Sequence, residues 1–456
     1  MKRNTFRAIC LLLLFSFIIE FSIPASAIEY NSLPSTDRAK CVYFYNVDAK
    51  SVIVKKGENE LISPASSSKI MTGLLACELL YDRLDEMVTI KSEMLTGTQG
   101  TSMQLKEGDT LSILSLIYGA VCGGFNDAAY AIAFITAGGH SGFVELMNKK
   151  AAELGAKNTA YTNPTGFDDP AQHTTLDDVA VIAKAALKNE LYMKISSTVS
   201  KNVSFENGKN DFTVHNRNGL IGSYYTTGYK NSLAKGMIAG FTDLGGYTVI
   251  TSAVINDTNY LCIVMGGTSE NGEISSYALA NELIYYASNN LKRQCIVEKD
   301  ELICTVPVKY ALDGAATRDG EDYLNVRTSE DVYAVLPIDI DISKITNKYH
   351  LYSDTLCAPV KKGDIVGVID FYLDDELIAS APLCVNAAVS ANTFLVKMEN
   401  AKRSMSGRTV LIPLFLFVIL SSLFFLFKSR QKRKAVKEIK MKRYQSQKST
   451  QKQQTR

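Results

Sequence analysis

The sequence predicts an α+β protein: one α+β domain, then a small all-β domain and a single membrane-spanning helix near the C-terminus. β-rich runs near both ends of residues 28–297, with helical periodicity between them, predict the first domain. Short β-rich runs between Asp/Gly turns over 298–392 predict the second domain. A chain of 456 residues can hold both, since domains usually have roughly 100–200 residues.

Local patterns place the elements of the two domains in chain order. Two β-rich runs around Asp48-Ala49-Lys50 predict a hairpin over 41–57. Pro64 and the serines after it are helix-start signals, so we expect a helix from Pro64 to Leu80. Similar patterns predict helices over Leu111–Cys122, Asp127–Ala137, Gly142–Leu154, Thr175–Leu187 and Ser275–Leu291, and strands over Val203–Glu206, Gly246–Ile255, Tyr260–Gly267, Ile303–Tyr310, Val332–Leu336, Asp364–Leu373 and Leu377–Pro382.

The two ends of the chain carry membrane-targeting patterns. Residues 1–27 have a basic start, an apolar run and a small-x-small end, which predicts a cleaved signal peptide; the alternative is an uncleaved anchor helix. Residues 410–427 are uncharged and would form a helix of about 27 Å, against a hydrocarbon core of about 30 Å. The tail 428–456 holds 12 Lys/Arg and one acidic residue, which predicts a cytoplasmic tail. We therefore expect a single-pass cell-membrane protein with extracytoplasmic domains, joined to the span by a connector over 393–409.

Charge and cysteine usage exclude several classes of protein. The outward part, 28–409, carries 34 basic and 45 acidic residues, a net charge of −11, which argues against a nucleic-acid partner. The basic tail is expected to set topology, although such a tail could also attract anionic lipid or RNA. The cysteines are widely spaced without a CxxC, so we expect buried thiols at Cys41, Cys77 and Cys262 and a bridge only between Cys295 and Cys304. Four scattered histidines and the absence of HExxH predict no metal and no cofactor.

One short motif carries candidate chemistry. Ser66-Ser67-Ser68-Lys69 is an S-x-x-K tetrad at a helix start, and a spacing of three residues places the lysine beside the serine hydroxyl on one helix face. A buried lysine has a lowered pKa and can take the serine proton, which makes the serine a nucleophile. The pattern alone is weak, because it recurs at Ser232–Lys235, Ser429–Lys432 and Ser449–Lys452.

The context of this tetrad is specific. Residues 39–73 resemble the opening of the low-molecular-mass penicillin-binding proteins, the D-alanyl-D-alanine carboxypeptidases of peptidase family S11. The resemblance continues in order through the segments 125–133, 143–169, 173–187, 215–221 and 240–253. It implies a serine β-lactamase/transpeptidase-like domain, with an antiparallel sheet and a helical subdomain, and it implies Ser66 as nucleophile and Lys69 as base.

Two of the three motifs of that family, S-x-x-K, S-x-N and K-T-G, are degenerate here. The second aligns at Gly124-Phe125-Asn126, so the serine is lost and Asn126, which orients the substrate amide in the family, is kept. The third aligns at Ile238-Ala239-Gly240, so the lysine and threonine that hold the substrate carboxylate are both apolar residues.

The resemblance still implies a backbone oxyanion hole beside Gly240, made by the N–H groups of Ser66 and Phe241. Lys235 lies an odd number of positions from Ile238, which points it to the other face of a strand. Arg217 is then the nearest candidate for a compensating cation.

Two hypotheses follow. In the first, Ser66 forms an acyl-enzyme with peptidoglycan stem peptides ending in D-Ala-D-Ala, and with β-lactams, with turnover impaired by Gly124, Ile238 and Ala239. In the second, the chain is a non-catalytic relative that binds wall peptide or a partner protein. The tyrosines 224, 225 and 229 could line a groove for glycan or peptide, and Asp168-Asp169 is expected to be a turn.

Overall fold

The computed structural model describes residues 32–58, 60–206, 208, 210–318, 321–398, 419–424 and 428. The described chain forms two compact units: the first contains the chain from its described start to Lys299 together with 330–350 and 368–381, and the second contains the remaining described residues.

A five-stranded sheet forms the centre of the first unit. Its strand order is β2-β1-β9-β8-β7, so strands from the beginning and the end of the domain pair with one another. Every neighbouring pair is antiparallel, as expected from the sequence. The strands are β1 (Cys41–Asn46), β2 (Ser51–Lys56), β7 (Ala234–Thr242), β8 (Gly246–Ile255) and β9 (Thr258–Gly267).

Helices make up the long middle of this unit. Side-chain caps start three of them, because Ser112, Thr175 and Asn189 each accept a backbone N–H from the first turn. The helices are α2 (Ser68–Leu79), α3 (Ile113–Val121), α4 (Asn126–Ala137), α5 (His140–Leu154), α6 (Leu176–Leu187), α7 (Glu190–Ser196) and α8 (Ser275–Asn290). The 3₁₀ turn η1 (Ala65–Ser67) leads into α2, and the short strands β3 (Met87–Thr89), β4 (Thr110–Ser112), β5 (Ser200–Val203) and β6 (Phe212–His215) form two small ribbons.

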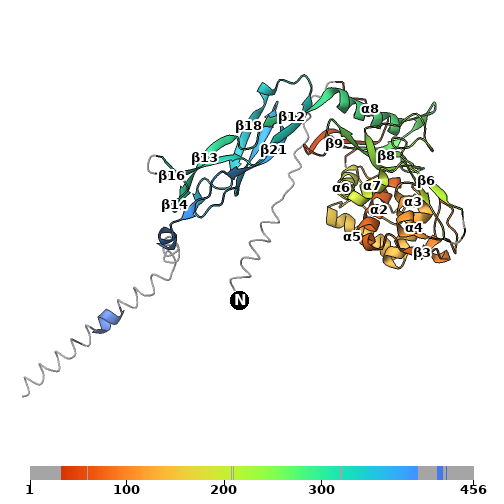
Figure 1. Cartoon of the computed structure of the whole chain (residues 1–456), viewed down its shortest axis with the longest axis horizontal. Helices are drawn as coiled ribbons and strands as arrows, with labels where there is room; N and C mark the ends of the chain where they lie inside the picture. Colours follow the sequence, from red (N-terminus) through yellow and green to blue (C-terminus); the bar gives the residue numbers. More distant parts are fainter. Residues whose placement is uncertain are drawn as a thin grey trace, which may run out of the picture. The chain divides into compact units, whose positions relative to one another are not determined.

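The sheet separates two hydrophobic cores. Alternate residues of β1 point to opposite faces: Tyr43 belongs to a core shared with α2–α7, whereas Val42 and Phe44 belong to a core shared with α8. Figure 1 shows β8 and β9 between α8 on one side and α2, α6 and α7 on the other. The N-terminus of α2 therefore lies at the edge of the sheet, where the S-x-x-K tetrad begins the helix.

The C-terminal part of the chain is β-rich, as predicted. Its larger sheet has the order β18-β20-β21-β16-β13-β19, and β12 pairs with β17 and β14 with β22. The strands are β12 (Leu291–Val297), β13 (Leu302–Lys309), β14 (Ala311–Asp313), β15 (Ala316–Arg318), β16 (Glu321–Thr328), β17 (Val332–Pro337), β18 (Thr346–Leu351), β19 (Leu356–Cys357), β20 (Ile365–Leu373), β21 (Glu376–Val385) and β22 (Ser390–Ala391).

Two details of the sequence prediction are wrong. The expected strand over 203–206 is instead β5, which ends at Val203. The expected Cys295–Cys304 bridge is absent: Cys295 lies in β12, which pairs with β17, whereas Cys304 lies in β13, which pairs with β16. Cys41, Cys77 and Cys262 are buried thiols, as expected.

The predicted signal peptide 1–27 lies outside the described residues, and so do most of 410–427 and the tail after Lys428. Within the residues that are described, no helix combines the length and the apolar character that a membrane crossing needs.

Candidate active site

Ser66 and Lys69 occupy the junction of η1 and α2. The side chain of Lys69 is buried, and its Nζ donates to the carbonyl oxygen of Thr165 at 2.8 Å. Ser66 is half-buried beside β7, at Gly240. A Cβ atom at Gly240 would overlap the Ser66 hydroxyl oxygen, so only glycine lets the strand approach the nucleophile this closely.

Burial changes the proton affinity of Lys69. Loss of hydration, with a smaller contribution from the positive charge of Arg217, lowers the pKa of Lys69 from about 10.5 to about 7. A large fraction of Lys69 amines is therefore neutral near pH 7 and can accept a proton. This property is what a general base for a serine hydroxyl requires.

Asn126, the residue of the second motif that is kept, is the first residue of α4. The backbone N–H of Asn126 donates to Thr101 O at 2.7 Å, and its Nδ2 donates to Gln99 O at 2.6 Å. Its Oδ1 is buried and has no hydrogen-bond partner among the described residues. A buried, unsatisfied amide oxygen is costly, so this atom is available to accept a ligand N–H.

Arg217 fills the space beside Gly124. A Cβ atom at Gly124 would lie 3.0 Å from Arg217 Cδ and 3.2 Å from Arg217 Nε. The arginine is fixed there by its backbone N–H on Cys122 O (2.9 Å) and its Nε on Gly123 O (3.0 Å). Gly124 also has φ +67°, a conformation that side chains disfavour. Arg217, from another segment, therefore lies against the position where the family motif has its serine.

The guanidinium of Arg217 has an aromatic partner and no acidic one among the described residues. Its Cζ lies 4.4 Å from the ring centre of Tyr225. Burial lowers the pKa of Arg217, and no carboxylate opposes this effect. Arg217 is therefore a largely buried cation near Lys69 without an acidic partner among the described residues, and it could bind an anionic group.

The third motif contributes no polar side chain. Ile238 belongs to the core shared with α2–α7 and Ala239 to the core shared with α8, and both are buried. Lys235 is exposed and donates to Ser232 O at 3.2 Å. The register of β7 shifts between Lys235 and Ile238, so the alternation of side chains between the two faces of the strand is interrupted there. The Lys235 side chain is nevertheless exposed and does not replace the lost lysine of the motif. Phe241 is exposed next to Gly240.

Sequence reasoning missed Thr165 and the loop around it. Asn163 Oδ1 accepts the N–H groups of Thr165 (3.1 Å) and Gly166 (2.8 Å), and this turn presents Thr165 O to Lys69. The sequence Asn-Pro-Thr-Gly is a turn signal of this kind.

Asp168 and Asp169, in the same loop, do not form a carboxylate dyad. Asp168 accepts hydrogen bonds from Ser63 Oγ (3.2 Å) and Leu244 N (2.9 Å), and Asp169 accepts one from Ala171 N at 2.9 Å.

The tyrosine cluster divides in two. Tyr224 and Tyr225 are exposed; the ring of Tyr224 stacks on His215 at 3.8 Å, and Tyr225 packs on Arg217. Tyr229 instead stacks on Tyr277 at 5.1 Å, and its hydroxyl accepts the N–H of Ile274 at 2.7 Å, which is a structural role.

Within the described chain, no group of His, Cys, Asp and Glu side chains could hold a metal ion.

The fold and this serine–lysine site place the first domain in the penicillin-binding, transpeptidase-like class, and a β domain follows it in the chain. The family model of the D-alanyl-D-alanine carboxypeptidases matches residues 31–269, and that of the penicillin-binding protein 5 C-terminal domain matches residues 295–391. The chain therefore belongs to the D-alanyl-D-alanine carboxypeptidase family S11, which confirms the resemblance seen in the sequence.

Relatives of the same family align with most of this chain. The D-alanyl-D-alanine carboxypeptidase DacF of Bacillus subtilis is 26% identical, over 81% of this chain and 90% of its own. DacD of Escherichia coli, described by the same activity, is 27% identical over 85% of this chain and 96% of its own. The crystal structure of penicillin-binding protein 5 from Haemophilus influenzae superposes with a TM-score of 0.64 and 25% identity, covering 78% of this chain and 99% of that one.

Proposed function

We propose that the protein is a serine acyl-enzyme of the cell wall, in which Ser66 attacks the carbonyl of the penultimate D-Ala of a stem peptide or the ring of a β-lactam. The observation that carries the proposal is the buried Lys69 with a pKa lowered to about 7, one helical turn from Ser66. The serine proton passes to Lys69 Nζ and Ser66 Oγ bonds to the carbonyl carbon; the C–N bond then breaks as its nitrogen takes the proton back from Lys69. The terminal D-Ala departs, whereas the nitrogen of an opened β-lactam stays attached to the acyl group. Backbone N–H groups of Ser66 and Phe241 would receive the oxyanion.

Arg217 replaces the lost lysine of the third motif as the cation for the substrate carboxylate. Its guanidinium lies near Lys69 and has no acidic partner among the described residues. It is held beside the second motif, where Arg217 Nε donates to Gly123 O. Asn126 Oδ1, unsatisfied and buried, would accept the amide N–H of the substrate.

Hydrolysis of the acyl-enzyme is the impaired step. Proton transfer by a general acid or base typically contributes about 10²–10⁴-fold, and Gly124 provides no hydroxyl for it. Ile238 and Ala239 remove two further polar groups from β7. A long-lived adduct is therefore expected.

The test is covalent labelling of the full-length protein with a fluorescent penicillin, read by intact mass. Ser66→Ala must abolish the adduct, while Ser232→Ala, in the S-x-x-K repeat outside the site, must leave it unchanged. The proposal is supported if the adduct persists for hours and if this protein releases D-Ala from a pentapeptide far more slowly than DacF does. The absence of any adduct at millimolar penicillin would refute it in favour of a non-catalytic wall-peptide or protein binder, the hypothesis that Gly124, Ile238 and Ala239 favour.

We also propose that the chain is exported and anchored in the cell membrane by residues 410–427, with its domains outside. The uncharged run and the basic tail after it support this topology. Deleting 410–456 should release the protein from the membrane fraction, and a protease added to intact protoplasts should digest the domains of the full-length protein. Protection of the domains would refute the proposed orientation.

A further inference from the structure

The two N–H groups proposed to receive the oxyanion come from segments that the sheet does not join. Ser66 lies in η1, and Phe241 lies near the end of β7. β7 is the last strand of the five-stranded sheet and pairs there with β8 alone. Among the described residues, no backbone hydrogen bond joins the segment 63–68 to the segment 234–246. Other contacts therefore set the distance between the two donors.

Close packing limits how near the two segments can come. A Cβ atom at Gly240 would lie 2.0 Å from Ser66 Oγ, and one at Gly245 would lie 2.6 Å from the Cβ of Ala65. Contacts of this kind resist compression, but each atom pair in van der Waals contact adds little attraction against separation. A directed polar link is what can hold the gap at one width.

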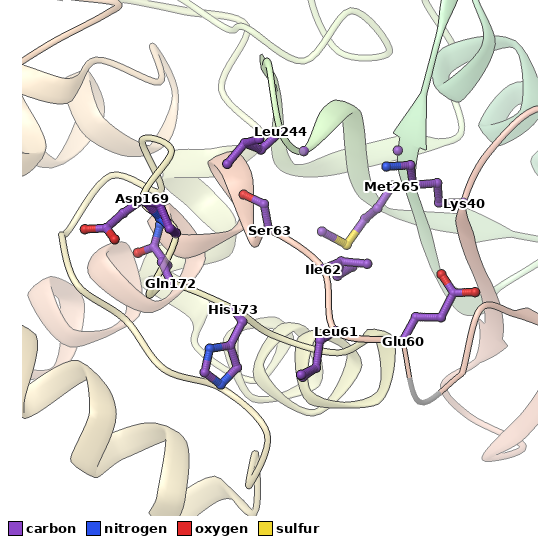
Figure 2. Close-up of a pocket in the computed structure, with 13 residues that line it drawn as sticks. Lys40, Glu60, Leu61, Ile62, Ser63, Asp169, Gln172, His173, Leu244 and Met265 are labelled. Carbon is purple, nitrogen blue, oxygen red and sulfur yellow. The ribbon is translucent and has the colours of Figure 1, made fainter.

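The carboxylate of Asp168 supplies such a link, which we call the Asp168 bridge. Ser63 Oγ donates to its Oδ1 at 3.2 Å, and the backbone N–H of Leu244 donates to its Oδ2 at 2.9 Å. Leu244, in the turn that follows β7, and Ser63 line the same groove, and Figure 2 shows them close together there, with the carboxylate of Asp169 directed away. Asp168 forms no ion pair with a described residue, so both of its oxygens serve these donors. Hydrogen bonds to a carboxylate are stronger than those between neutral groups.

The Asp168 bridge also acts on the backbone just before the nucleophile. Ser63 Oγ accepts the N–H of Ala65 at 3.4 Å, and Ala65 has φ +47°, a left-handed conformation that side chains disfavour. A Cβ atom at Gly166 would lie 1.6 Å from Ala65 O, so only glycine lets the loop lie against this residue. The strained turn that presents Ser66 is thus held by the loop that carries Asp168.

This loop is fixed from within, so it can serve as a rigid tether. Asn163 Oδ1 accepts the N–H of Gly166 at 2.8 Å, and Asn163 Nδ2 donates to Phe167 O at 3.0 Å. Thr165 O, in the same loop, accepts a hydrogen bond from Lys69 Nζ at 2.8 Å. One loop therefore contacts the base, the turn before the nucleophile and the turn after β7.

We infer that Asp168 is a positioning residue, which keeps the N–H groups of Ser66 and Phe241 at the separation that an oxyanion needs. The inference rests on the proposed function for the identity of these two donors. Asp168 acts through Ser63 and Leu244 and does not touch the substrate. Its loss should let the turn after β7 move away from η1, which weakens hydrogen bonds made in the transition state more than contacts that bind the unreacted substrate.

Acylation kinetics of the full-length protein test this role. The rate of labelling by a fluorescent penicillin, measured over a range of concentrations, separates the dissociation constant of the first complex from the maximal acylation rate constant. We expect Asp168→Ala to lower the maximal rate constant by about 10–100-fold and to change the dissociation constant by less than about threefold. Asp168→Asn should recover most of the rate, because its amide oxygen can accept Leu244 N–H while its NH₂ group donates to Ser63 Oγ.

Two further variants make the result specific. Ser63→Ala removes the other end of the Asp168 bridge, so it should lower the rate by a similar factor, and the double variant should lose little more than either single one. Asp169→Ala is the matched control, because Asp169 lies in the same loop but accepts its hydrogen bond from Ala171 N at 2.9 Å. Its acylation rate should equal that of the unchanged protein.

Two measurements report on the tether itself. In the acyl-enzyme of Asp168→Ala, the stretching frequency of the ester carbonyl should rise, because weaker hydrogen bonds polarise the C=O bond less; a variant that is only less stable would not show this shift. Amide hydrogen exchange, read by mass spectrometry, needs no acylation. Residues 241–246 should exchange faster in Asp168→Ala than in Asp169→Ala, since Leu244 N–H loses its acceptor.

Normal acylation of Asp168→Ala, an Asp168→Asn protein as slow as Asp168→Ala, a slow Asp169→Ala protein, or unchanged exchange of residues 241–246 would each overturn the inference. Failure of the unchanged protein to form any adduct would overturn the proposed function instead. In that case the exchange measurement still decides whether Asp168 holds the two segments together.

Discussion

The pH dependence of acylation tests the role of Lys69 most directly. If the pKa of Lys69 is about 7, the neutral amine is about 9% of the protein at pH 6, half at pH 7 and about 91% at pH 8. The rate constant of penicillin acylation, which needs the neutral amine, should rise about tenfold from pH 6 to pH 8 and then level off. A lysine with an unshifted pKa near 10.5 would give about a hundredfold rise over the same interval, with no plateau below pH 10.

The assay is the second-order rate constant for labelling by a fluorescent penicillin, measured at constant ionic strength between pH 5.5 and 9.5. The variant Arg217→Gln supplies the internal comparison. The positive charge of Arg217 disfavours protonation of Lys69, so its removal should raise the pKa of Lys69 and move the midpoint of the rate profile to higher pH. A profile that rises tenfold per pH unit up to pH 9, or one that does not change with pH, would refute Lys69 as the base.

Three further predictions concern stability and sterics. Because the pKa of Lys69 is lower in the folded than in the unfolded protein, burial of the charged amine lowers the free energy of unfolding by up to about 5 kcal/mol below pH 7, and this cost declines towards pH 10.5. After the lost hydrogen bond is subtracted, Lys69→Met should raise the free energy of unfolding, measured in urea, by about 2–3 kcal/mol at pH 6 and by almost nothing at pH 9. An equal gain at both pH values would contradict the burial argument. Gly124→Ser should lower the free energy of unfolding by about 1–3 kcal/mol, because the serine would have a positive φ and a close contact with Arg217. Adding Arg217→Ala should recover part of that loss, and a free energy of unfolding unchanged by the serine would show that the arginine moves freely. Gly240→Ala should lower the acylation rate by roughly a hundredfold or more, because the added methyl group overlaps the nucleophile, whereas Gly139→Ala, with open space around it, should not; a Gly240→Ala protein that labels normally would show that the strand is not so close.

Most of the first domain could be predicted from local pattern. The hairpin of β1 and β2 and helices α2 to α6 end within a few residues of their predicted bounds. Ser112 and Thr175 cap the starts of α3 and α6, and Gly138 and Gly155 end α4 and α5, so these bounds are local signals in the sequence. The misplaced β5 is a short, largely exposed strand that pairs only with β6, so its sequence carries no buried face to detect. Cys295 and Cys304 illustrate the limit of sequence distance, since a turn between them leads into a different sheet.

The candidate site was only partly readable. The spacing of Ser66 and Lys69 is a local property of the sequence, and the structure has Ser66 in η1 and Lys69 in the first turn of α2. The relation between Gly124 and Arg217 is a packing contact between distant segments, and a single sequence does not show which atoms fill a vacated volume. For the same reason, Thr165 O as the partner of Lys69 appears only when the 163–166 turn is folded against α2.

The contact between Gly124 and Arg217 also bears on how this site can be re-engineered. The Cβ of a serine at position 124 would lie 3.0 Å from Arg217 Cδ and 3.2 Å from Arg217 Nε, so the benefit of either residue depends on the other. Restoring the serine at Gly124 alone should therefore give a variant that is less stable than the starting protein while Arg217 keeps its present position. A serine introduced at position 124 should therefore be tested together with changes at position 217, because the effect of each residue depends on the other.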